Sequence, residues 1–547
     1  MEAITADLTA LRVALLWSVP LLYALAAAVP GPRTGNSDAA WRWARRGATL
    51  ALAAALLSVV WLLAGGPGLA RGPIVFSLGQ FGALSLSLRS DALANIMLLL
   101  VTFIGWIIVG YSQPYLGGQR GQARFIRSLM LTLAAVTLLV LTNNLLVLAV
   151  AWIGTSLALH SLLTFFDQRP QALIAAHKKF LASRVADLCI LSAIALAASQ
   201  LGTLEIDRVI AAGRSHGEHS AVLHAAAVMF VLAACLKCAQ LPVHGWLIQV
   251  MEAPTPVSAL LHAGIVNLGG FLLIRLGTLV ADVPVAQALL VGIGSITAVV
   301  AAATMMTRIS IKVALAWSTC AQMGFMLMQC GLGLYDLALL HIVAHSLYKA
   351  YAFLTAGTAV EQSRLHQMTP SASPMSVQAW LASALVGAGV VATAALAWAI
   401  RPADAPALWA VTAILALALA PLLAGPMVRA GGFWSVAGIA GAFAVALAYF
   451  GLHLLFKRWV GVPSSANMAL VAWFIGCFAA LFIVQGAVRA RPSGALARGL
   501  YPWLFAGLYL DEVFTRLTFR MWPARMAANP DAPQPILPDV RAPGALR

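Results

Sequence analysis

Long apolar stretches recur along the whole chain and are separated by short polar segments. Fifteen runs hold about 17–26 mostly apolar residues each, and the first is too long to be the core of a signal peptide. About 20 apolar residues in a helix cross a bilayer, so the pattern predicts an all-α, polytopic transmembrane bundle of about 15–16 helices. The predicted spans are Leu8–Val29, Ala44–Ala64, Ala92–Tyr111, Phe125–Leu141, Leu145–Phe166, His177–Ala198, Ala221–Leu241, Thr255–Val280, Val285–Thr304, Ile311–Leu332, Leu337–Val360, Val377–Ile400, Leu408–Leu423, Val436–Phe456 and Met468–Val488.

Basic residues alternate between the connecting segments. Seventeen Arg and Lys residues, including Lys178 and Lys179, follow odd-numbered spans, against seven that follow even-numbered spans. Because cytoplasmic loops are enriched in Lys and Arg, we expect the segments after odd-numbered spans in the cytoplasm. The pattern therefore predicts a multi-pass protein of the cell inner membrane with a periplasmic N-terminus.

The composition agrees with a membrane protein and argues against nucleic-acid binding. Hydrophobic residues make up 61% of the 547 residues, charged residues make up 10%, and the mean hydropathy is +0.90. A soluble domain averages about 25% charged residues. The excess of 34 Lys and Arg over 18 Asp and Glu lies mainly between apolar spans, so we expect a lipid membrane and no nucleic acid as partner. The six cysteines are scattered in apolar segments and are expected to be buried apolar residues.

The junction of the seventh and eighth spans combines buried charge with helix breakers. Lys237 lies within the seventh span, and Pro242, Pro254 and Pro256 follow it. Proline removes a backbone donor and breaks a helix. An ammonium deep in a bilayer costs at least roughly 2.5–3.5 kcal/mol on the insertion scale, so such a residue marks a functional site. Broken helices beside buried charge are typical of transporter sites, and we predict that Lys237 is the centre of an ion pathway.

Further ionisable side chains lie within or beside neighbouring spans. Arg184 and Asp187 are three residues apart on one helix face and could pair. His341, His345 and Lys349 follow one another at intervals of four residues and line one helix face. The complete predicted set for a proton or ion pathway is Lys237, Arg184, Asp187, His262, Lys312, His341, His345, Lys349, His160, Glu252 and His244.

Three interpretations compete for the row His341, His345 and Lys349. A metal site would use histidines four residues apart, but an acidic ligand is missing and a cation follows one turn later. A structural polar stripe between helices is the second interpretation. A proton relay fits best, because imidazole titrates near neutral pH and a desolvated lysine can exchange protons with it.

Motifs for nucleotide binding or redox chemistry are missing from the sequence. It contains no Walker A loop, no G-x-G-x-x-G after a strand and no cysteine cluster for iron–sulfur. We therefore expect an ion-translocating subunit rather than an enzyme, with no cofactor and no metal of its own.

Five longer motifs stand out in this part of the chain: SRVAD (183–187), AQLPVHGWL (239–247), APTPVSALLHA (253–263), IKVALAWSTCAQMG (311–324) and HIVAHSLYKA (341–350). They resemble the proton-pumping membrane subunits of respiratory complex I, in the L-subunit branch that also contains Mrp-type cation/proton antiporter subunits. The resemblance covers roughly the region from Phe125 to Val360, and LYLDEVF at 508–514 also resembles this branch.

This resemblance implies a role for each matching residue. Lys237 would be the central proton-carrying lysine, and Arg184 and Asp187 would lie near the proton-uptake path. The four residues on the hydrated axis between half-channels would be His262, His341, His345 and Lys349. The implied fold has two inverted five-helix repeats, the fourth to eighth and ninth to thirteenth spans, each containing a broken helix.

The resemblance also divides the chain into four units. Residues 1–124 would be N-terminal helices, 125–425 the antiporter-like core, and 426–522 C-terminal helices. Residues 523–547 would form a disordered or partner-bound tail. Leu500–Trp522 is too charged to face lipid, so it is expected either to pack in the bundle or to lie at the interface.

Three departures from the complex I pattern stand out. Trp152-Ile153 replaces a Trp-Glu pair whose glutamate would face the central lysine, and His160, on the same face, could partly substitute for it. The twelfth span, Val377–Ile400, carries no charge. We also expect this chain to lack the long lateral helix of the L-subunit branch.

This combination resembles the DabB family, the membrane subunits of two-component inorganic-carbon accumulation systems of autotrophic bacteria. That resemblance implies a soluble zinc-binding partner, DabA, similar to β-carbonic anhydrases, in a heterodimer or larger assembly. A flow of protons, or of sodium ions, would drive CO2 hydration to bicarbonate in the partner. The alternatives are a proton-pumping subunit of a quinone oxidoreductase or hydrogenase, a cation/proton antiporter subunit, and a non-conducting scaffold.

Overall fold

The computed structural model describes residues 2–28, 37–214, 220–358, 377–400, 406–428, 432–460 and 467–522. The predicted C-terminal tail, residues 523–547, lies outside these residues. Within them, thirteen helices are long and apolar enough to cross a membrane, and two shorter apolar helices accompany them. Together they match the fifteen predicted spans, so the prediction of an all-α, multi-pass membrane bundle is confirmed.

The long helices follow the order of the predicted spans. They are α1 (Glu2–Ala28), α2 (Asp38–Gly65), α3 (Ala92–Tyr115), α4 (Gln122–Leu141), α5 (Leu145–Leu163), α6 (Pro170–Leu201), α8 (Ala221–Lys237), α10 (Thr255–Ala263) with α11 (Leu268–Arg275), α13 (Pro284–Met305), α14 (Ile311–Gly331), α15 (Tyr335–Leu354), α17 (Val377–Ala397), α18 (Pro406–Val428), α19 (Gly432–Lys457) and α20 (Met468–Ala490).

Short elements lie between these helices along the chain. They are β1 (Gly68–Ala70), β2 (Ile74–Ser77), η1 (Gly79–Phe81), β3 (Ala83–Ser85), β4 (Leu88–Ser90), α7 (Ile206–Arg214), α9 (Gly245–Gln249), η2 (Val250–Glu252), η3 (Ile265–Asn267), α12 (Gly277–Val280), η4 (Ala356–Thr358), α21 (Ala495–Phe505), η6 (Gly507–Tyr509) and α22 (Leu510–Met521). The strands form two antiparallel pairs, β1 with β4 and β2 with β3.

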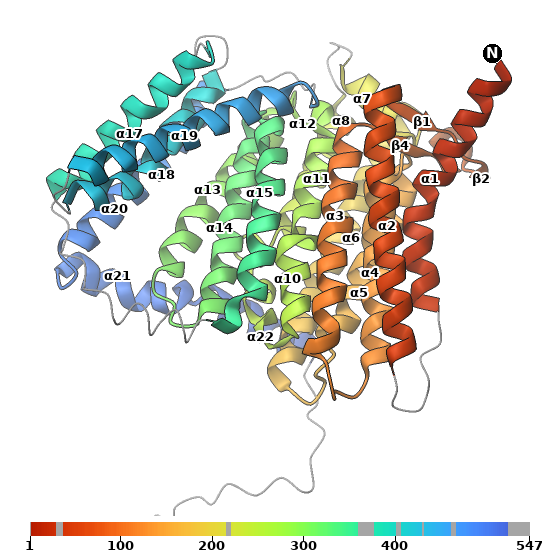
Figure 1. Cartoon of the computed structure of the whole chain (residues 1–547), viewed down its shortest axis with the longest axis horizontal. Coiled ribbons are helices and arrows are strands. Elements are labelled where there is room, and N and C mark those ends of the chain that lie inside the picture. Colours follow the sequence, from red (N-terminus) through yellow and green to blue (C-terminus); the bar gives the residue numbers. More distant parts are fainter. Residues whose placement is uncertain are drawn as a thin grey trace, which may run out of the picture.

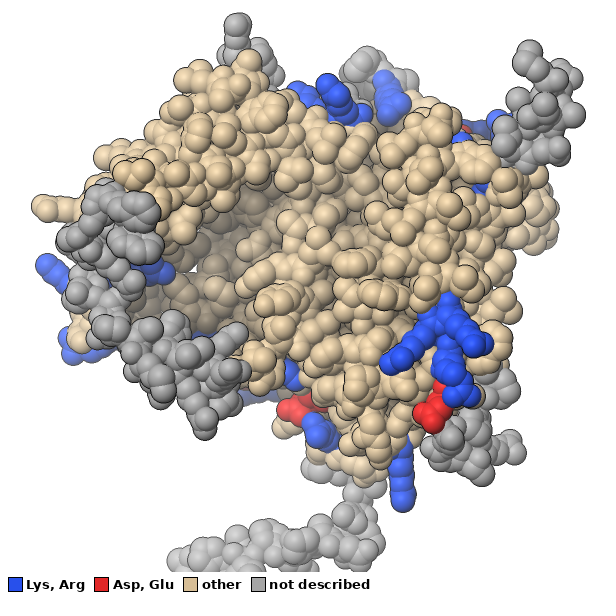
Figure 2. All heavy atoms as spheres, in the orientation of Figure 1, with Lys and Arg blue, Asp and Glu red and all other residues tan. Residues whose placement is uncertain are grey.

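The spanning helices pack in two groups (Figure 1). Helices α1 to α15 stand side by side, while α17 to α20 pack on one another and meet the first group through α13 and α15. Figure 2 shows Lys and Arg side chains mainly near the upper and lower ends of one face, with a band of uncharged side chains between them. Such a band is what the hydrocarbon core of a bilayer requires. The predicted inverted repeats and the division into four units stay predictions.

The seventh span is broken as the prolines predicted. Helix α8 ends at Lys237, and α9 begins only at Gly245. Between them Ala239 has a positive φ of 50°, a conformation that a helix does not contain. The eighth span is interrupted as well, by the 3₁₀ turn η3 between α10 and α11.

Helix α6 begins earlier than predicted, and this corrects the position of two lysines. Pro170 is the first residue of α6, a position that suits proline because the first helical N–H needs no intrahelical acceptor. Lys178 and Lys179 therefore lie inside the helix, and both side chains are buried. Counting them among the cytoplasmic loop charges was wrong, because α6 extends seven residues before the predicted span His177–Ala198, which already included them. Without them, fifteen basic residues still follow odd-numbered spans, against seven that follow even-numbered spans, so the predicted orientation does not change.

The segment Leu500–Trp522 crosses the lower end of the bundle in Figure 1 as α21 and α22. Helix α22 has 12 residues, about 18 Å, too short to span a membrane. It contacts α6 and α9. The Asp511 carboxylate accepts hydrogen bonds from Lys178 Nζ and Gln249 Nε2, each at 2.8 Å. The segment therefore packs across the helix ends.

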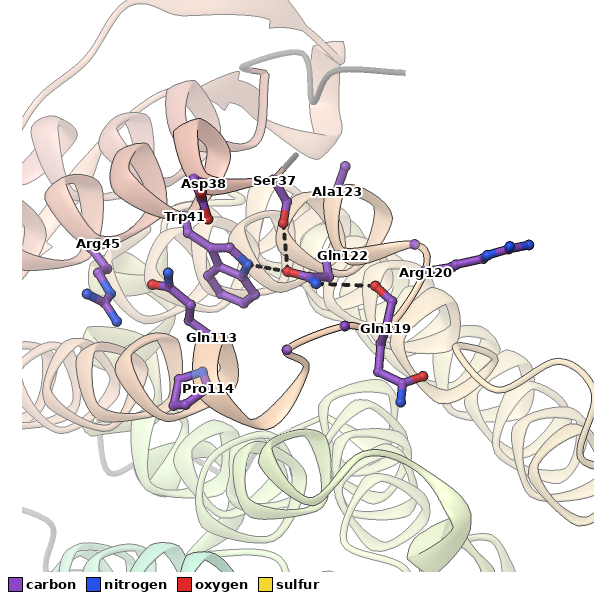
Figure 3. Close-up of a pocket in the computed structure, with 13 residues that line it drawn as sticks. Ser37, Asp38, Trp41, Arg45, Gln113, Pro114, Gln119, Arg120, Gln122 and Ala123 are labelled. Carbon is purple, nitrogen blue, oxygen red and sulfur yellow. Dashed lines mark hydrogen bonds between the residues drawn. The ribbon is translucent and has the colours of Figure 1, made fainter. Parts of the chain in front are cut away.

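The same end of the bundle contains a cavity of about 1040 Å³ between the start of α2, the end of α3 and the start of α4 (Figure 3). The Gln122 side chain joins these helices. Its Oε1 accepts hydrogen bonds from Ser37 Oγ and Trp41 Nε1, each at 2.7 Å, and its Nε2 donates to the Leu116 carbonyl at 3.0 Å. None of the predicted pathway residues lines this cavity.

Glu205 organises the opposite end, before α7. Its carboxylate accepts hydrogen bonds from the hydroxyls of Ser85 and Ser87 beside β3 and from Asn143 Nδ2 at 2.7 Å. Carboxylate hydrogen bonds of this kind are about twice as strong as neutral ones. They attach the strand segment to the start of α5.

We predict that Asp511→Asn loosens α22. Lys178 is 0% exposed, and losing its carboxylate partner leaves a buried ammonium without an ion pair, which typically costs about 3–5 kcal/mol. Limited trypsin digestion of the detergent-solubilised protein should then cleave after Arg516 and Arg520 at least about tenfold faster, because local proteolysis follows the population of the open form. Glu512→Gln removes the same charge from the exposed neighbouring residue and should digest like the wild type. Equal rates for Asp511→Asn and wild type would contradict the prediction.

Candidate ion pathway

Lys237 ends α8 in the interior of the bundle. Its side chain is 6% exposed, and its Nζ atom has no hydrogen-bond partner among the described residues. The ammonium lies 4.3 Å from the centroid of the Trp152 ring on α5. The electron-rich face of an indole ring attracts a desolvated cation. Lys237 therefore remains buried beside an aromatic face and an unwound stretch of backbone.

Three further ionisable side chains lie near Lys237, and all are on α6: Lys179, Arg184 and Asp187. Together with Lys237 they form what we call the Lys237 cluster. Arg184 pairs with Asp187 at 2.7 Å, as their spacing predicted. Lys179 Nζ donates to the carbonyl and the hydroxyl of Ser156 at 2.5 and 2.8 Å, and Arg184 donates to the same hydroxyl at 3.3 Å. The Asp187 carboxylate attracts the Lys237 ammonium as well. Three cations thus share one buried carboxylate.

Sequence reasoning missed Lys179 and Ser156. Lys179 lies near the start of the predicted span His177–Ala198 but was counted among the cytoplasmic loop charges. The helical phase contained the signal, because Lys179 lies eight residues before Asp187 and therefore on the same face of α6. Ser156 lies one turn after Trp152 on α5, so the two residues bring one face of α5 to the cluster.

The position of the missing glutamate is occupied by Ile153, which packs against the apolar core. His160, the predicted partial substitute, places its ring 5.4 Å from that of Phe180 and 6.5 Å from that of Trp522. Trp152 rather than His160 contacts the Lys237 ammonium. The carboxylate that acts on this lysine comes from α6 instead of α5.

A second group, the histidine–lysine cluster, consists of His262, His341, His345 and Lys349. The rings of His341 and His345 are 6.0 Å apart, and electrostatic interactions link His345 to the three other members. Lys349 Nζ donates to the Leu315 carbonyl at 3.2 Å. Both ring nitrogens of His262 and of His345 are buried and lack hydrogen-bond partners in the described part of the chain. The structure thus brings these four predicted residues together.

Helix α11 lies between the two clusters, because it packs against both α8 and α15. Asn267, in the interruption before α11, donates to Ser346 Oγ on α15 at 2.8 Å. The side-chain oxygen of Asn267, Oδ1, is buried without a partner among the residues described. The broken eighth span therefore contributes polar groups to the region between the clusters.

Glu252, Lys312 and His244 lie around the connection from α8 to α10, outside both clusters. The Glu252 side chain is 43% exposed and pairs with Arg169 at 3.4 Å, a surface ion pair. Lys312 Nζ donates to Thr255 Oγ1 at 2.9 Å. His244 is buried beside Pro242, with an Nδ1-to-carbonyl distance of 3.3 Å.

A buried contact between an aspartate and a histidine, which the sequence did not suggest, lies beyond His341. Asp336, in the first turn of α15, contacts His453 Nδ1 on α19 at 2.5 Å. Both side chains are buried. Asp336 to Lys349 spans 13 residues of one helix, about 20 Å, so ionisable groups extend along most of α15.

Two family models match the chain. Residues 142–371 match the NADH:quinone oxidoreductase/Mrp antiporter transmembrane family, and residues 76–126 match the N-terminus of complex I chain 5. Over 537 residues the chain is 38% identical to the inorganic carbon transporter subunit DabB2 of Halothiobacillus neapolitanus, covering 96% of this chain and 97% of the relative. The chain belongs to the DabB family.

The chain is also similar to another DabB subunit and to subunits of complex I and of an Mrp complex. A DabB subunit of Hydrogenovibrio crunogenus is 43% identical over 79% of this chain and 82% of its own. The NADH-quinone oxidoreductase subunit L of Escherichia coli is 33% identical, over 52% of this chain and 46% of its own. A structure of the Mrp complex from Dietzia sp. matches 96% of this chain and 57% of that chain, with a TM-score of 0.57 and 25% identity. The resemblance predicted from the motifs is confirmed.

We predict that Asp187→Asn destabilises the protein more than Arg184→Gln. The first change leaves three cations of the Lys237 cluster without a carboxylate. Breaking a buried ion pair in this way typically lowers the free energy of unfolding by about 3–5 kcal/mol. The second leaves Asp187 beside Lys237 and Lys179. Thermal unfolding in detergent should show the larger fall in Tm for Asp187→Asn, whereas Ser199→Ala, at an exposed position of α6, should unfold like the wild type. The reverse order of the two variants would contradict this account.

Proposed function

We propose that this protein is the ion-conducting membrane subunit of an inorganic carbon transporter. The observation that supports this most is the pair of buried clusters on the two sides of α11. Buried polar atoms normally have hydrogen-bond partners, yet Lys237 Nζ and the rings of His262 and His345 have none among the described residues. A concentration of such atoms near broken helices is typical of a hydrated ion path.

The proposed route runs from the Lys237 cluster past the interruption at Asn267 to the histidine–lysine cluster. It then follows α15 from Lys349 through His345 and His341 to Asp336 and His453. This last pair supplies ionisable groups that the uncharged α17 lacks. The route would connect the predicted cytoplasmic half of the bundle with the predicted periplasmic end.

The chemistry of the side chains favours protons over sodium ions. Hard cations prefer oxygen ligands such as carboxylates and carbonyls. The two clusters instead offer mainly imidazole and amine nitrogens, which bind and release protons. We therefore propose protons as the conducted ion.

The proposed partner is a soluble, zinc-binding subunit of the DabA type, similar to carbonic anhydrases. Hydration of CO2 yields one bicarbonate and one proton. Proton flow through this chain, down its gradient, would make that reaction directional in the partner. The zinc chemistry belongs to the partner, and this chain supplies the ion path.

The alternative functions, a subunit of a quinone oxidoreductase or an antiporter, have weaker support. The match to DabB2 extends over 97% of that relative, whereas the match to the Escherichia coli subunit L extends over 46%. The glutamate that the complex I pattern places before the central lysine is Ile153 in this chain.

We predict that Lys237→Met lowers proton flux of the reconstituted complex at least about tenfold, which corresponds to about 1.4 kcal/mol in the barrier. The reason is that the substitution removes the central proton-binding group and keeps an apolar side chain of similar length. A pH-sensitive dye inside proteoliposomes measures the flux, and growth at ambient CO2 measures carbon uptake. Lys457→Met, at an exposed lysine that ends α19, is the matched control and should behave like wild type. Unchanged carbon uptake by Lys237→Met would remove this residue from the mechanism.

Affinity purification from the native membrane separates the proposed function from its alternatives. We expect a soluble subunit that carries zinc, measured by mass spectrometry of the metal, to co-purify with the chain. Flavin and iron–sulfur subunits in its place would support the oxidoreductase and contradict the carbon transporter. Further Mrp-type membrane subunits would support the antiporter.

A further inference from the structure

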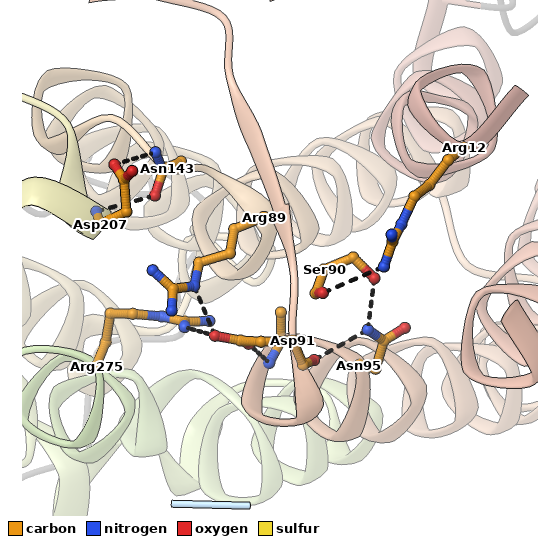
Figure 4. Close-up of polar contacts among 9 residues, drawn as sticks. Arg12, Arg89, Ser90, Asp91, Asn95, Asn143, Asp207 and Arg275 are labelled. Atoms are coloured by element: carbon orange, nitrogen blue, oxygen red, sulfur yellow. Dashed lines mark hydrogen bonds and ion pairs between the residues drawn. The ribbon is translucent and has the colours of Figure 1, made fainter. Parts of the chain in front are cut away.

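A compact charged site lies at the end of the bundle opposite α22, where α3 begins and α11 ends (Figure 4). The Asp91 carboxylate accepts a hydrogen bond from the Ala94 amide of α3 at 2.8 Å. It also pairs with Arg89 Nε at 2.6 Å and with Arg275 Nη1 at 2.5 Å. Figure 4 shows the guanidinium groups of Arg89 and Arg275 converging on this carboxylate.

The carboxylate neutralises only part of the positive charge. Burial alone would raise the pKa of Asp91, but Arg275 and Arg89 hold it well below its usual range, so the group is ionised at neutral pH. A cavity of about 80 Å³ adjoins the pair, and Arg214 lines it as well. Three guanidinium groups and one carboxylate therefore leave a net positive site.

Arg275 still has hydrogen-bond donors to offer. Its side chain is 3% exposed, and its Nε and Nη2 atoms have no acceptor among the described residues. A buried charged donor without an acceptor costs several kcal/mol, so an acceptor in the adjoining cavity would stabilise it. The other lining side chains, such as Trp459 and Ile274, supply no negative charge.

We propose that this cavity binds a small planar oxyanion, namely bicarbonate. The cavity of about 80 Å³ has room for one anion of four heavy atoms. A guanidinium fork presents two parallel N–H groups that match two oxygens of a planar oxyanion. The choice of bicarbonate among such anions rests on the proposed function.

Bicarbonate would bind at the predicted periplasmic end of the bundle, away from the Lys237 cluster and the histidine–lysine cluster. It lies at one end of α11, whose other end follows the interruption at Asn267. Helix α11 has eight residues, about 12 Å, so an anion bound at Arg275 would hold the helix that separates the two clusters.

The test is a thermal-shift and calorimetric titration of the purified complex with sodium bicarbonate, at constant pH and ionic strength, with sodium chloride and sodium nitrate as competing probes. We expect saturable binding of bicarbonate by the wild type. Arg214→Gln, at an exposed position, should weaken it at least about tenfold, or about 1.4 kcal/mol, and Arg275→Lys should abolish it. Arg71→Gln, an exposed arginine that lines a different cavity, should bind like wild type.

Non-saturable bicarbonate effects, or equal affinity in the wild type and Arg214→Gln, would overturn the proposal and leave a water-filled cavity. Nitrate or chloride binding as tight as bicarbonate would overturn the assignment of the ligand. If Arg275→Lys does not fold, the bicarbonate affinity of Arg214→Gln relative to the wild type decides whether the proposal holds. The Lys237→Met complex should keep bicarbonate binding while losing proton flux, so the two proposals can fail separately.

Discussion

The burial of ammonium and guanidinium groups in an apolar bundle is the constraint on which the rest of this structure depends. Each such group would be strongly disfavoured in a bilayer without partners. Lys237 has the face of Trp152, the carboxylate of Asp187 and an unwound backbone nearby. The breaks in the seventh and eighth spans follow from the same requirement, since polar backbone at this depth is tolerated only where protein or a hydrated cavity surrounds it.

Helix α6 connects this interior to the end of the bundle. Lys178 and Lys179 are neighbours in sequence, and successive residues of a helix point about 100° apart. Lys178 therefore reaches Asp511 on α22, while Lys179 reaches Ser156 on α5. The C-terminal helix is thereby attached to the same turn of α6 that supplies a cation to the Lys237 cluster.

Helix α11 has a similar connecting role on the other side. It begins at the interruption that contributes Asn267 to the polar region, and it ends at Arg275, which pairs with Asp91 at the start of α3. Two contacts thus hold the helices around the proposed route, one at each end of the bundle: α22 packs on α6 through Asp511 and Lys178, and the start of α3 pairs with the end of α11 through Asp91 and Arg275.

Local patterns in the sequence determined the number of spans, the break after Lys237, the Arg184–Asp187 pair and the row on α15. Each depends on residues close together in the chain, so helical periodicity and proline chemistry suffice. Only the tertiary structure decided which groups meet across helices: Lys179 with Ser156, Lys178 with Asp511, Asp336 with His453, and Asp91 with Arg275. Those partners are 23, 333, 117 and 184 residues apart. The count of basic residues assigned Lys178 and Lys179 to a loop, because a sequence pattern shows the cost of burying a charge and not the distant partner that offsets it.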